Sequence, residues 1–410
     1  MQEYHVIVIG GGPAGATVAA LVAQHSHKVL VCERDAFPRF RIGESLMPGT
    51  YWTLQRLGVF DKMKKSPFTR KYSVQFYTKS GKAASPFYFN ENEPEERAQT
   101  WQVLRSDFDK LMLDNARNKG AEVLHGVNVL DVLFDGERAT GVRVKMPDKS
   151  VQDFKASVVV DASGQSALLS RKLKISRREP CLENAAIFSH FRGAARDCGI
   201  DEGATIIFQT ENDDSWFWYI PLHNDVVSIG VVGHIDYLLT SRKKDAQAIF
   251  DEELTKCKAL IPRLESATQL FPVKVTKEFS YKADRTAGDG WVLIGDAFGF
   301  LDPIYSSGIF LALKSGEMAA DAINEAFEKN DFSAAQLGKF EAELLTGVEA
   351  IRKLVYAFYN REFSFARFLK KYPECRKDII NILVGNVYRE SVNGLSVRLE
   401  EFVGGLESAC

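Results

Sequence analysis

The sequence predicts an α/β fold in which a Rossmann-like domain adjoins an antiparallel β-sheet region and a helical C-terminal segment. Three observations lead to this prediction: a βαβ pattern at the start of the chain, polar loops after two later apolar runs, and helix-forming residues from Ile309 onward. The 410 residues also exceed the roughly 250 to 300 that one hydrophobic core usually holds. We therefore expect more than one packed region.

The βαβ pattern comprises a buried strand over residues 5–9, an Ala-rich helix over 14–24 and a second strand over 28–32. Two further apolar runs, over residues 156–160 and 291–294, also have the composition of buried strands. Each of these runs ends in a polar loop. We therefore expect both strands to carry ligand-binding residues at their ends.

Residues 205–234 alternate β-branched and aromatic side chains with turn residues between them, which predicts antiparallel strands. Helical patterns follow over residues 309–327 and 334–359. The predicted division is a discontinuous nucleotide-binding domain (1–70, 100–180 and 285–330), a β-sheet substrate region (71–99 and 181–284) and a helical C-terminal segment (331–410).

Composition argues against several partners and sites. Lys and Arg number 52 against 54 Asp and Glu, a balance unlike that of nucleic-acid-binding proteins, and a mean hydropathy of -0.16 argues against integral membrane association. The N-terminus enters the first strand directly, so we expect no export and a cytoplasmic location. The cysteines form no CxxC pair, which predicts no metal site and reduced thiols at Cys32, Cys181, Cys198, Cys257, Cys375 and Cys410.

A GxGxxG pattern lies between the first strand and the first helix. Its glycines allow a tight turn and close approach of a pyrophosphate to the helix N-terminus, and an acidic residue at the end of the second strand suits a ribose hydroxyl. Taken alone, the pattern is also compatible with a plain glycine turn. The predicted nucleotide contacts are Gly10, Gly12, Pro13, Ala14, Gly15, Glu33 and Arg34.

Four later motifs make the cofactor specific. GDA at 295–297, DASG at 161–164, an arginine opening a helix at 105, and GES at 43–45 after RFR at 39–41 resemble motifs of the FAD monooxygenase and halogenase superfamily. The resemblance implies an FAD-binding domain of the glutathione-reductase and hydroxylase type. No second nucleotide fingerprint follows, so we expect reduced FAD to come from a separate flavin reductase. The implied cofactor contacts are Arg41, Ser45, Arg105, Asp161, Gly164, Gly295 and Asp296.

WFWYIP at residues 216–221 matches WxWxIP, the signature of flavin-dependent halogenases. Strand alternation places Trp216, Trp218 and Ile220 on one face, which by itself predicts an aromatic core. In the family this wall separates the organic substrate from the flavin. The resemblance therefore implies a substrate barrier made by Trp216, Trp218, Ile220 and Pro221.

Residues 70–76 resemble the lysine segment of phenol and pyrrole halogenases, in which a lysine carries or orients hypohalous acid. The resemblance implies that Lys71 is catalytic. As an isolated residue, a lysine opening a strand is more often a solvated surface group. Lys79 is the weaker competing candidate and is expected in a turn.

DPIYSSGI at residues 302–309 resembles the halide and flavin loop of the same family. The loop precedes a helix, whose free N–H groups suit an anion, although related monooxygenases use this helix end for flavin charge. The resemblance implies chloride or bromide at the amides of Ser307 and Gly308, a catalytic Ser306 on the route to Lys71, and cofactor contacts from Pro303, Gly308 and Ile309.

The expected function is that of an FAD-dependent halogenase, which uses reduced FAD, dioxygen and chloride or bromide to halogenate an electron-rich aromatic ring. Tyr305 occupies the position of a glutamate in tryptophan halogenases, which favours a phenolic or pyrrole-like substrate, free or on an acyl carrier protein. A geranylgeranyl-reductase-like flavoprotein, an aromatic hydroxylase and a flavoprotein that only binds a partner stay open. Ile220 before Pro221, together with Lys71, favours the halogenase over the reductase.

Overall fold

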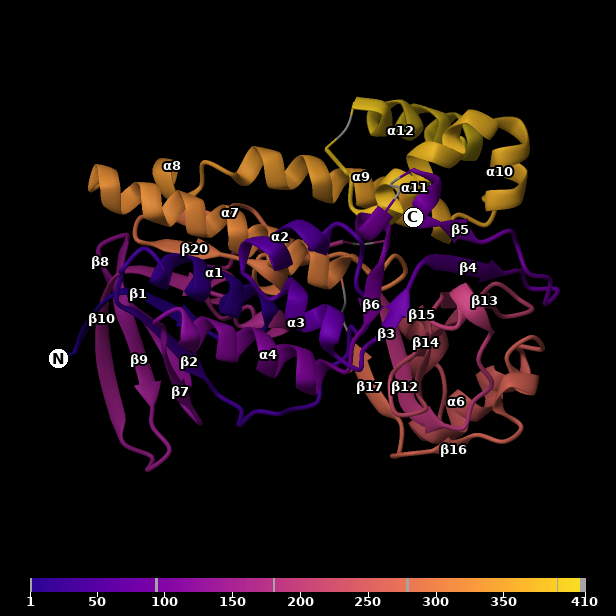
Figure 1. Ribbon diagram of the computed structural model, residues 1–410, viewed down its shortest axis with the longest axis horizontal. Coiled ribbons are helices and arrows are strands. Elements are labelled where there is room, and N and C mark those ends of the chain that lie inside the picture. Colours follow the sequence, from indigo (N-terminus) through magenta and orange to yellow (C-terminus); the bar gives the residue numbers. More distant parts are fainter. Residues whose placement is uncertain (1, 93–94, 180, 278–279, 389, 406–410) are drawn as a thin grey trace.

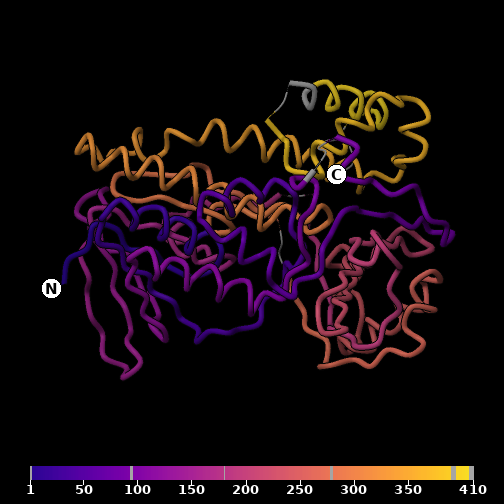
Figure 2. Tube along the Cα trace, in the orientation of Figure 1, coloured from indigo at the N-terminus to yellow at the C-terminus, as the bar shows by residue number. Residues whose placement is uncertain are grey.

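A computed structural model describes residues 2–92, 95–179, 181–277, 280–388 and 390–405 (Figure 2). Two mixed sheets, one on each side of the molecule, are joined by helices that run along one face (Figure 1). No helix within these described residues is long and apolar enough to cross a membrane. The same part of the chain contains no cluster of His, Cys, Asp and Glu suited to a metal ion.

The first sheet has the parallel core that the N-terminal sequence predicts. Its central strands run in the order β20, β10, β1, β2, β7, and each neighbouring pair is parallel. Polar loops leave the carboxyl ends of these strands at one edge, where ligands bind in such folds. The strands are β1 (Glu3–Ile9), β2 (Val29–Glu33), β7 (Glu122–His125), β10 (Val151–Asp161) and β20 (Trp291–Leu293), with β8 (Asn128–Asp135), β9 (Arg138–Lys145) and β19 (Ala287–Gly288) antiparallel beside them.

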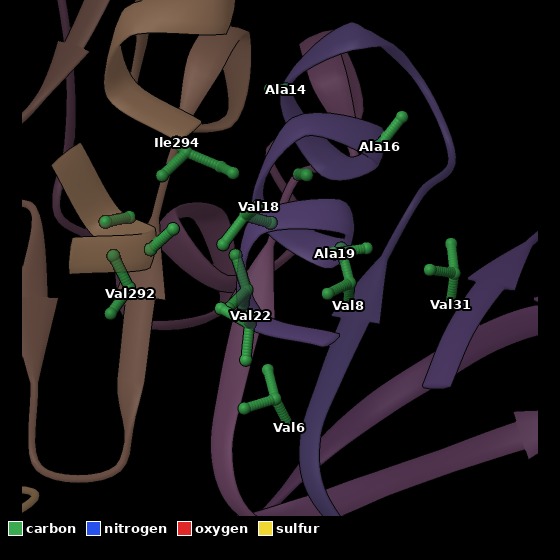
Figure 3. Packing of buried hydrophobic residues seen from close by; sticks show 14 of the residues in the cluster. Val6, Val8, Ala14, Ala16, Val18, Ala19, Val22, Val31, Val292 and Ile294 are labelled. Atoms are coloured by element: carbon green, nitrogen blue, oxygen red, sulfur yellow. The ribbon is translucent and has the colours of Figure 1, made fainter. Parts of the chain in front are cut away.

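Small residues allow close packing around α1 (Pro13–Ala23), which is buried along its whole length. A Cβ on Gly15 would lie 2.0 Å from the carbonyl oxygen of Gly10, and a Cβ on Gly316 would lie 2.8 Å from that of Ala14. Helix α1 therefore packs tightly against its own entry loop and against α7 (Ser307–Lys329). Figure 3 shows Val18 and Val22 of α1 among apolar side chains of β1 and β20.

The second sheet runs in the order β16, β12, β15, β14, β13, β4, β5, with β17 paired to β12. Trp216, Trp218 and Ile220 of β14 enter one core, whereas Phe217 and Tyr219 enter the core beneath α6 (Ala246–Thr255), which confirms the predicted alternation. The strands are β4 (Ser73–Tyr77), β5 (Phe87–Tyr88), β12 (Asn184–Arg192), β13 (Thr205–Gln209), β14 (Ser215–Pro221), β15 (Val226–His234), β16 (Thr268–Gln269) and β17 (Lys274–Lys277).

Short elements connect the two sheets. The two-stranded sheet of β3 (Thr69–Lys71) and β6 (Thr100–Gln102) lies between them and carries Lys71 at the end of β3. Lys71 thus closes one strand immediately before β4, where the sequence suggested that it opens one. The remaining connecting elements are α2 (Thr50–Arg56), α3 (Phe60–Lys65), α4 (Arg105–Asn118), α5 (Leu168–Lys172), β11 (Ser176–Arg178), β18 (Tyr281–Ala283) and β21 (Gly299–Phe300).

The helical C-terminal segment shares one core with the tryptophan face of the second sheet. The expected continuous helix over residues 334–359 is wrong, because Gly338 ends α8 (Ala334–Leu337) and α9 (Glu341–Tyr359) begins three residues later. A Cβ on Gly338 would lie 3.2 Å from that of Ala287, so the chain turns where it approaches β19. The segment continues as α10 (Phe365–Lys371), α11 (Arg376–Val384) and α12 (Glu390–Val403).

The cysteines differ in state. Cys32, Cys198, Cys257 and Cys375 are free thiols, as expected, but Cys181 is disulfide-bonded. The expectation of reduced thiols is therefore wrong for Cys181, and Cys410, for which the same was expected, lies outside the described residues. Wide spacing along the sequence carries no information about which thiols the fold brings together.

Candidate active site

A cavity of about 740 Å³ lies between the carboxyl edge of the first sheet and the tryptophan face of the second. Many of the residues predicted from the sequence line it: Gly10, Gly12, Pro13, Ala14, Glu33, Arg34, Arg41, Ser45, Arg105, Gly164, Trp218, Ile220, Asp296, Pro303, Ser306, Gly308 and Ile309. The other predicted residues are not part of this lining: Gly15, Lys71, Asp161, Trp216, Pro221, Gly295 and Ser307.

The glycine loop leaves an open cradle at the start of α1. A Cβ on Gly12 would meet only the Nη2 of Arg39, at 3.7 Å, and no side chain caps the N-terminus of the helix. The carboxylate of Glu33 accepts a hydrogen bond from the Gly11 amide at 2.7 Å, which fixes it beside the loop. Free helix N–H groups beside a glycine turn fit a pyrophosphate, so the residues present fit a dinucleotide.

Two arginines and one buried carboxylate form the wall of the cavity next to this loop. Arg105 donates from Nε and Nη2 to Asp109 at 2.8 and 3.0 Å, and Arg39 donates to the same carboxylate at 2.8 Å. Arg105 also donates to the carbonyl oxygens of Ile42 and Gly43. This bidentate pairing holds the Arg105 guanidinium rigidly in the cavity wall.

The two acidic residues predicted to contact the cofactor occupy different environments. Asp296 lines the cavity, and burial raises the pKa of its carboxyl to about 6 although Arg105 opposes the shift. Asp161 lies behind the lining, where its oxygens accept hydrogen bonds from the amides of Ser163 and Leu169 at 2.9 and 2.7 Å. Asp161 thus shapes the loop that carries Gly164 into the cavity, and its carboxylate does not face the ligand space.

The N-terminus of α7 also lies at the cavity, where Ser306 and Gly308 belong to the lining. Ser306 has a left-handed backbone (φ 58°), Ser307 begins the helix, and no side chain caps this end. A Cβ on Gly308 would touch only Phe300, at 3.6 Å, so the backbone here is accessible from the cavity. Because the first N–H groups of a helix have no intrahelical partner, this end is suited to an anion.

Lys71 is buried, with a side chain among the largest that are fully enclosed. Its Nζ donates to Ser45 Oγ at 2.8 Å and to the carbonyl oxygen of Leu46 at 3.2 Å, and it lies 5.4 Å from the ring centre of Phe89. Burial lowers the pKa of the amine to about 7. Lys79, in contrast, is exposed beyond β4 and pairs with Asp213, which removes it from the site.

A chain of buried polar groups that the sequence did not reveal leads from Lys71 to the cavity. Ser45 and Thr205 both line the cavity, their hydroxyls are 2.9 Å apart, and Gln102 Nε2 donates to Thr205 Oγ1 at 2.9 Å. Thr205 and Gln102 carry no signal in the sequence, because their proximity depends on pairing between distant strands. Ser45 was detectable through its GES motif, but its hydrogen bond to Lys71 was not.

Glu44 and His190 form a second polar pair beside the cavity. Both side chains are buried, and His190 Nε2 lies 2.7 Å from Glu44 Oε1. Glu44 belongs to the same GES motif and lines the cavity, whereas His190 comes from β12. The motif could have pointed to Glu44, but no spacing in the sequence pointed to its partner.

The parallel sheet, the glycine cradle and the cavity bounded by two helix N-termini define an FAD-dependent oxidoreductase. The chain belongs to the tryptophan halogenase family, whose model matches residues 5–101 and 79–364. It is accordingly a flavin-dependent halogenase, an enzyme that uses FAD together with chloride or bromide. The halogenase prediction is confirmed over the reductase and hydroxylase alternatives.

Known relatives match the chain over nearly its whole length. The 1H-pyrrole-2-carbonyl-[peptidyl-carrier protein] chlorinase of Pseudomonas fluorescens is 32% identical over 99% of this chain and 94% of its own. The corresponding brominase of Pseudoalteromonas luteoviolacea is 32% identical over 94% of this chain and 92% of its own. The solved structure of the flavin-dependent brominase Bmp2 superposes with a TM-score of 0.86 at 30% identity and covers 98% of both chains.

Substitution in the glycine cradle should separate cofactor binding from folding. Gly12→Ala adds a Cβ where the protein itself leaves space, so we expect weaker FAD binding with an unchanged melting temperature. Gly15→Ala, the matched control, adds a Cβ that clashes with the carbonyl of Gly10, so it should lower the melting temperature as well. FAD titration and calorimetry measure both effects; native FAD affinity in the Gly12→Ala variant contradicts the assignment of the cradle.

The buried amine of Lys71 should make stability depend on pH. The pKa falls from 10.5 to about 7 on folding, so the unfolded chain binds more protons between these values and the native state gains stability as the pH rises through this window. Lys71→Met removes the amine. We expect its melting temperature, relative to the unsubstituted protein, to be highest at pH 6.5 and to decline toward pH 9.5; a difference independent of pH contradicts the buried amine.

Proposed function

We propose that the protein halogenates a pyrrole ring attached to a carrier protein, and that Lys71 delivers the halogen. The observation that supports this proposal most directly is the buried amine of Lys71, whose pKa is lowered by burial. The amine donates a hydrogen bond to Ser45, which lines the cavity. The pyrrolyl-carrier relatives, which match the chain almost from end to end, support the substrate class. Tyr305 in place of the glutamate of tryptophan halogenases agrees with it.

The first sheet holds the cofactor. The glycine cradle and the α1 N-terminus would hold the pyrophosphate of FAD, Glu33 would bind a ribose hydroxyl, and Arg105 and Asp296 would provide further polar contacts to the cofactor. Arg34, Arg41, Ser45, Gly164, Pro303 and Ile309 complete the contacts. Reduced FAD, when bound, supplies with dioxygen the oxidising power that turns a halide into an electrophile. A separate flavin reductase provides the reduced cofactor, and the enzyme works in the cytoplasm.

The second half of the cavity handles the halogen. In this proposal the amides of Ser307 and Gly308 hold chloride or bromide at the α7 N-terminus. Ser306 and Ser45 both line the cavity, and Ser45 accepts a hydrogen bond from Lys71, which supports a route for the halogen past Ser306 to Lys71. Trp218 and Ile220, backed by Trp216 and Pro221, keep the organic ring away from the cofactor. A pKa of about 7 leaves a large fraction of Lys71 neutral at physiological pH. The neutral amine can take the halogen from hypohalous acid with release of water, and then transfer it to the ring, whose displaced proton returns to the nitrogen.

The carrier requirement can be tested with two matched substrates. We expect product from a pyrrole-2-carbonyl group attached to a peptidyl carrier protein, supplied with FAD, a flavin reductase, NADH, dioxygen and bromide. Free pyrrole-2-carboxylate under the same conditions should react far more slowly, because it lacks the binding energy of the carrier. Mass spectrometry of both substrates decides the question. Equal rates, or bromination of free phenols alone, exclude a carrier-bound substrate.

Substitution of Lys71 should separate halogen delivery from flavin chemistry. Lys71→Ala should retain FAD binding and oxygen consumption but lose halogenated product by about two or more powers of ten. Lys79→Ala, the matched control on the exposed lysine, should react normally. Lys71→Arg distinguishes two modes of delivery, because a guanidinium stays protonated yet still donates hydrogen bonds. Activity in the arginine variant but not in the alanine variant favours hydrogen-bonded delivery, and near-normal activity in the alanine variant removes Lys71 from the mechanism.

A further inference from the structure

A buried hydrogen-bonded chain links the barrier strand, the C-terminal helices and the loop before α7. The indole Nε1 of Trp216 donates to the hydroxyl of Tyr359 at 3.0 Å, and that hydroxyl donates to Asp302 Oδ2 at 3.0 Å. Asn184 donates to the same oxygen at 3.2 Å, and the amide of Ile304 donates to Oδ1 at 2.9 Å. The Tyr359 hydroxyl thus accepts a hydrogen bond from Trp216 of the barrier strand and donates one to Asp302 in the loop before α7.

The two barrier tryptophans are fixed by different parts of the protein. Trp218, which lines the cavity, donates from Nε1 to Ser228 on the neighbouring strand of its own sheet. Trp216, whose ring centre lies 6.5 Å from that of Trp218, is fixed instead by Tyr359 at the end of α9. Figure 1 shows α9 extending from alongside α7 toward the helices above the second sheet.

Asp302 transmits this contact to the start of α7. Its side chain is buried, and among the described residues its hydrogen-bond donors are neutral: a tyrosine hydroxyl, an asparagine amide and a backbone amide. Burial raises the pKa of its carboxyl to about 7, so the carboxylate depends strongly on these donors. The bond to Ile304 fixes the loop that leads directly into Ser306 and Ser307.

We propose that Tyr359 is a positioning residue that locks the barrier indole of Trp216 to the halide loop through Asp302. The C-terminal helical segment thereby sets how firmly the α7 N-terminus holds halide and how completely the barrier retains the oxidised halogen. This inference rests on the halide and barrier roles proposed above, but it does not depend on the identity of the organic substrate.

The phenylalanine variant removes the link with the smallest change of shape. Tyr359→Phe leaves the Trp216 N–H without its acceptor and Asp302 without one of its donors, so the indole and the loop both lose a constraint. Tyr356→Phe is the matched control, because it removes a hydroxyl from the same helix turn that donates to Glu179 instead. Asp302→Asn tests the other end of the chain.

Two readouts distinguish positioning from a general loss of stability. We expect Tyr359→Phe to raise the KM for bromide roughly three- to tenfold and to divert more of the consumed dioxygen to hydrogen peroxide, with little change in melting temperature. The assay uses monochlorodimedone, which reacts with hypobromous acid, in place of the pyrrole substrate. The measurement therefore stays valid even if the carrier-bound pyrrole hypothesis is wrong. Asp302→Asn should act in the same direction, and the double variant should be no worse than the more impaired single variant.

The second readout needs neither cofactor nor turnover. The five tryptophans of the chain give separable indole N–H signals in NMR, and Trp216→Phe identifies the relevant one. Tyr359→Phe should shift this signal and speed its exchange with solvent, whereas Tyr356→Phe should leave it unchanged. An unaltered indole signal, or a native bromide KM and native peroxide yield in Tyr359→Phe, overturns the proposal, as does a lowered melting temperature without either effect.

Discussion

The hydrogen bond from Lys71 to Ser45 joins the two halves of the site, and the arrangement around it follows from the segment to which Ser45 belongs. Earlier carbonyl groups of that segment, those of Ile42 and Gly43, accept hydrogen bonds from Arg105 in the cofactor wall. The carbonyl oxygen of Leu46, the residue after Ser45, accepts a hydrogen bond from Lys71. Five consecutive residues, 42–46, therefore connect Arg105 in the cavity wall to the buried Lys71.

Helix α7 imposes the second constraint. It packs along α1 at a separation that a small residue permits, since a Cβ on Gly316 would lie 2.8 Å from the Ala14 carbonyl oxygen and 3.1 Å from the Cβ of Thr17. Both helices begin at the same cavity, so two positive helix ends face one ligand space from different sides. The N-terminus of α1 suits a pyrophosphate, and the N-terminus of α7 suits a halide ion or the negative charge of a flavin. The small residues at this interface are thus part of the electrostatic design of the site.

The sequence predicted those parts of the site that depend on local structure. The glycine loop with Glu33 and the alternation of residues 216–221 follow from local spacing, and the family resemblance indicated Arg105. The structure confirms the alternation and places Glu33 and Arg105 in the lining of the cavity. Contacts between distant elements were not predictable, as Thr205 beside Ser45 and Tyr359 beside Trp216 illustrate. The carboxylate of Asp161 shows the converse, because a motif identified the loop correctly but could not reveal that its side chain faces inward. The burial of Lys71 was equally unpredictable, because the sequence does not show that the fold encloses this amine and thereby lowers its pKa.

In the proposed function, cofactor binding and substrate recognition depend on different stretches of the chain. Many residues of the cavity lining come from the first 45 residues and from the start of α7, whereas aromatic residues of the C-terminal helices pack against the tryptophan face. There Phe358 packs against Trp216 and Tyr305, and Phe365 packs against Phe76. Changes in these helices can alter the space offered to a ring without disturbing the cradle or Lys71. Because Tyr359 of α9 is hydrogen-bonded to Asp302, such changes also reach the loop before α7, where we propose that halide binds.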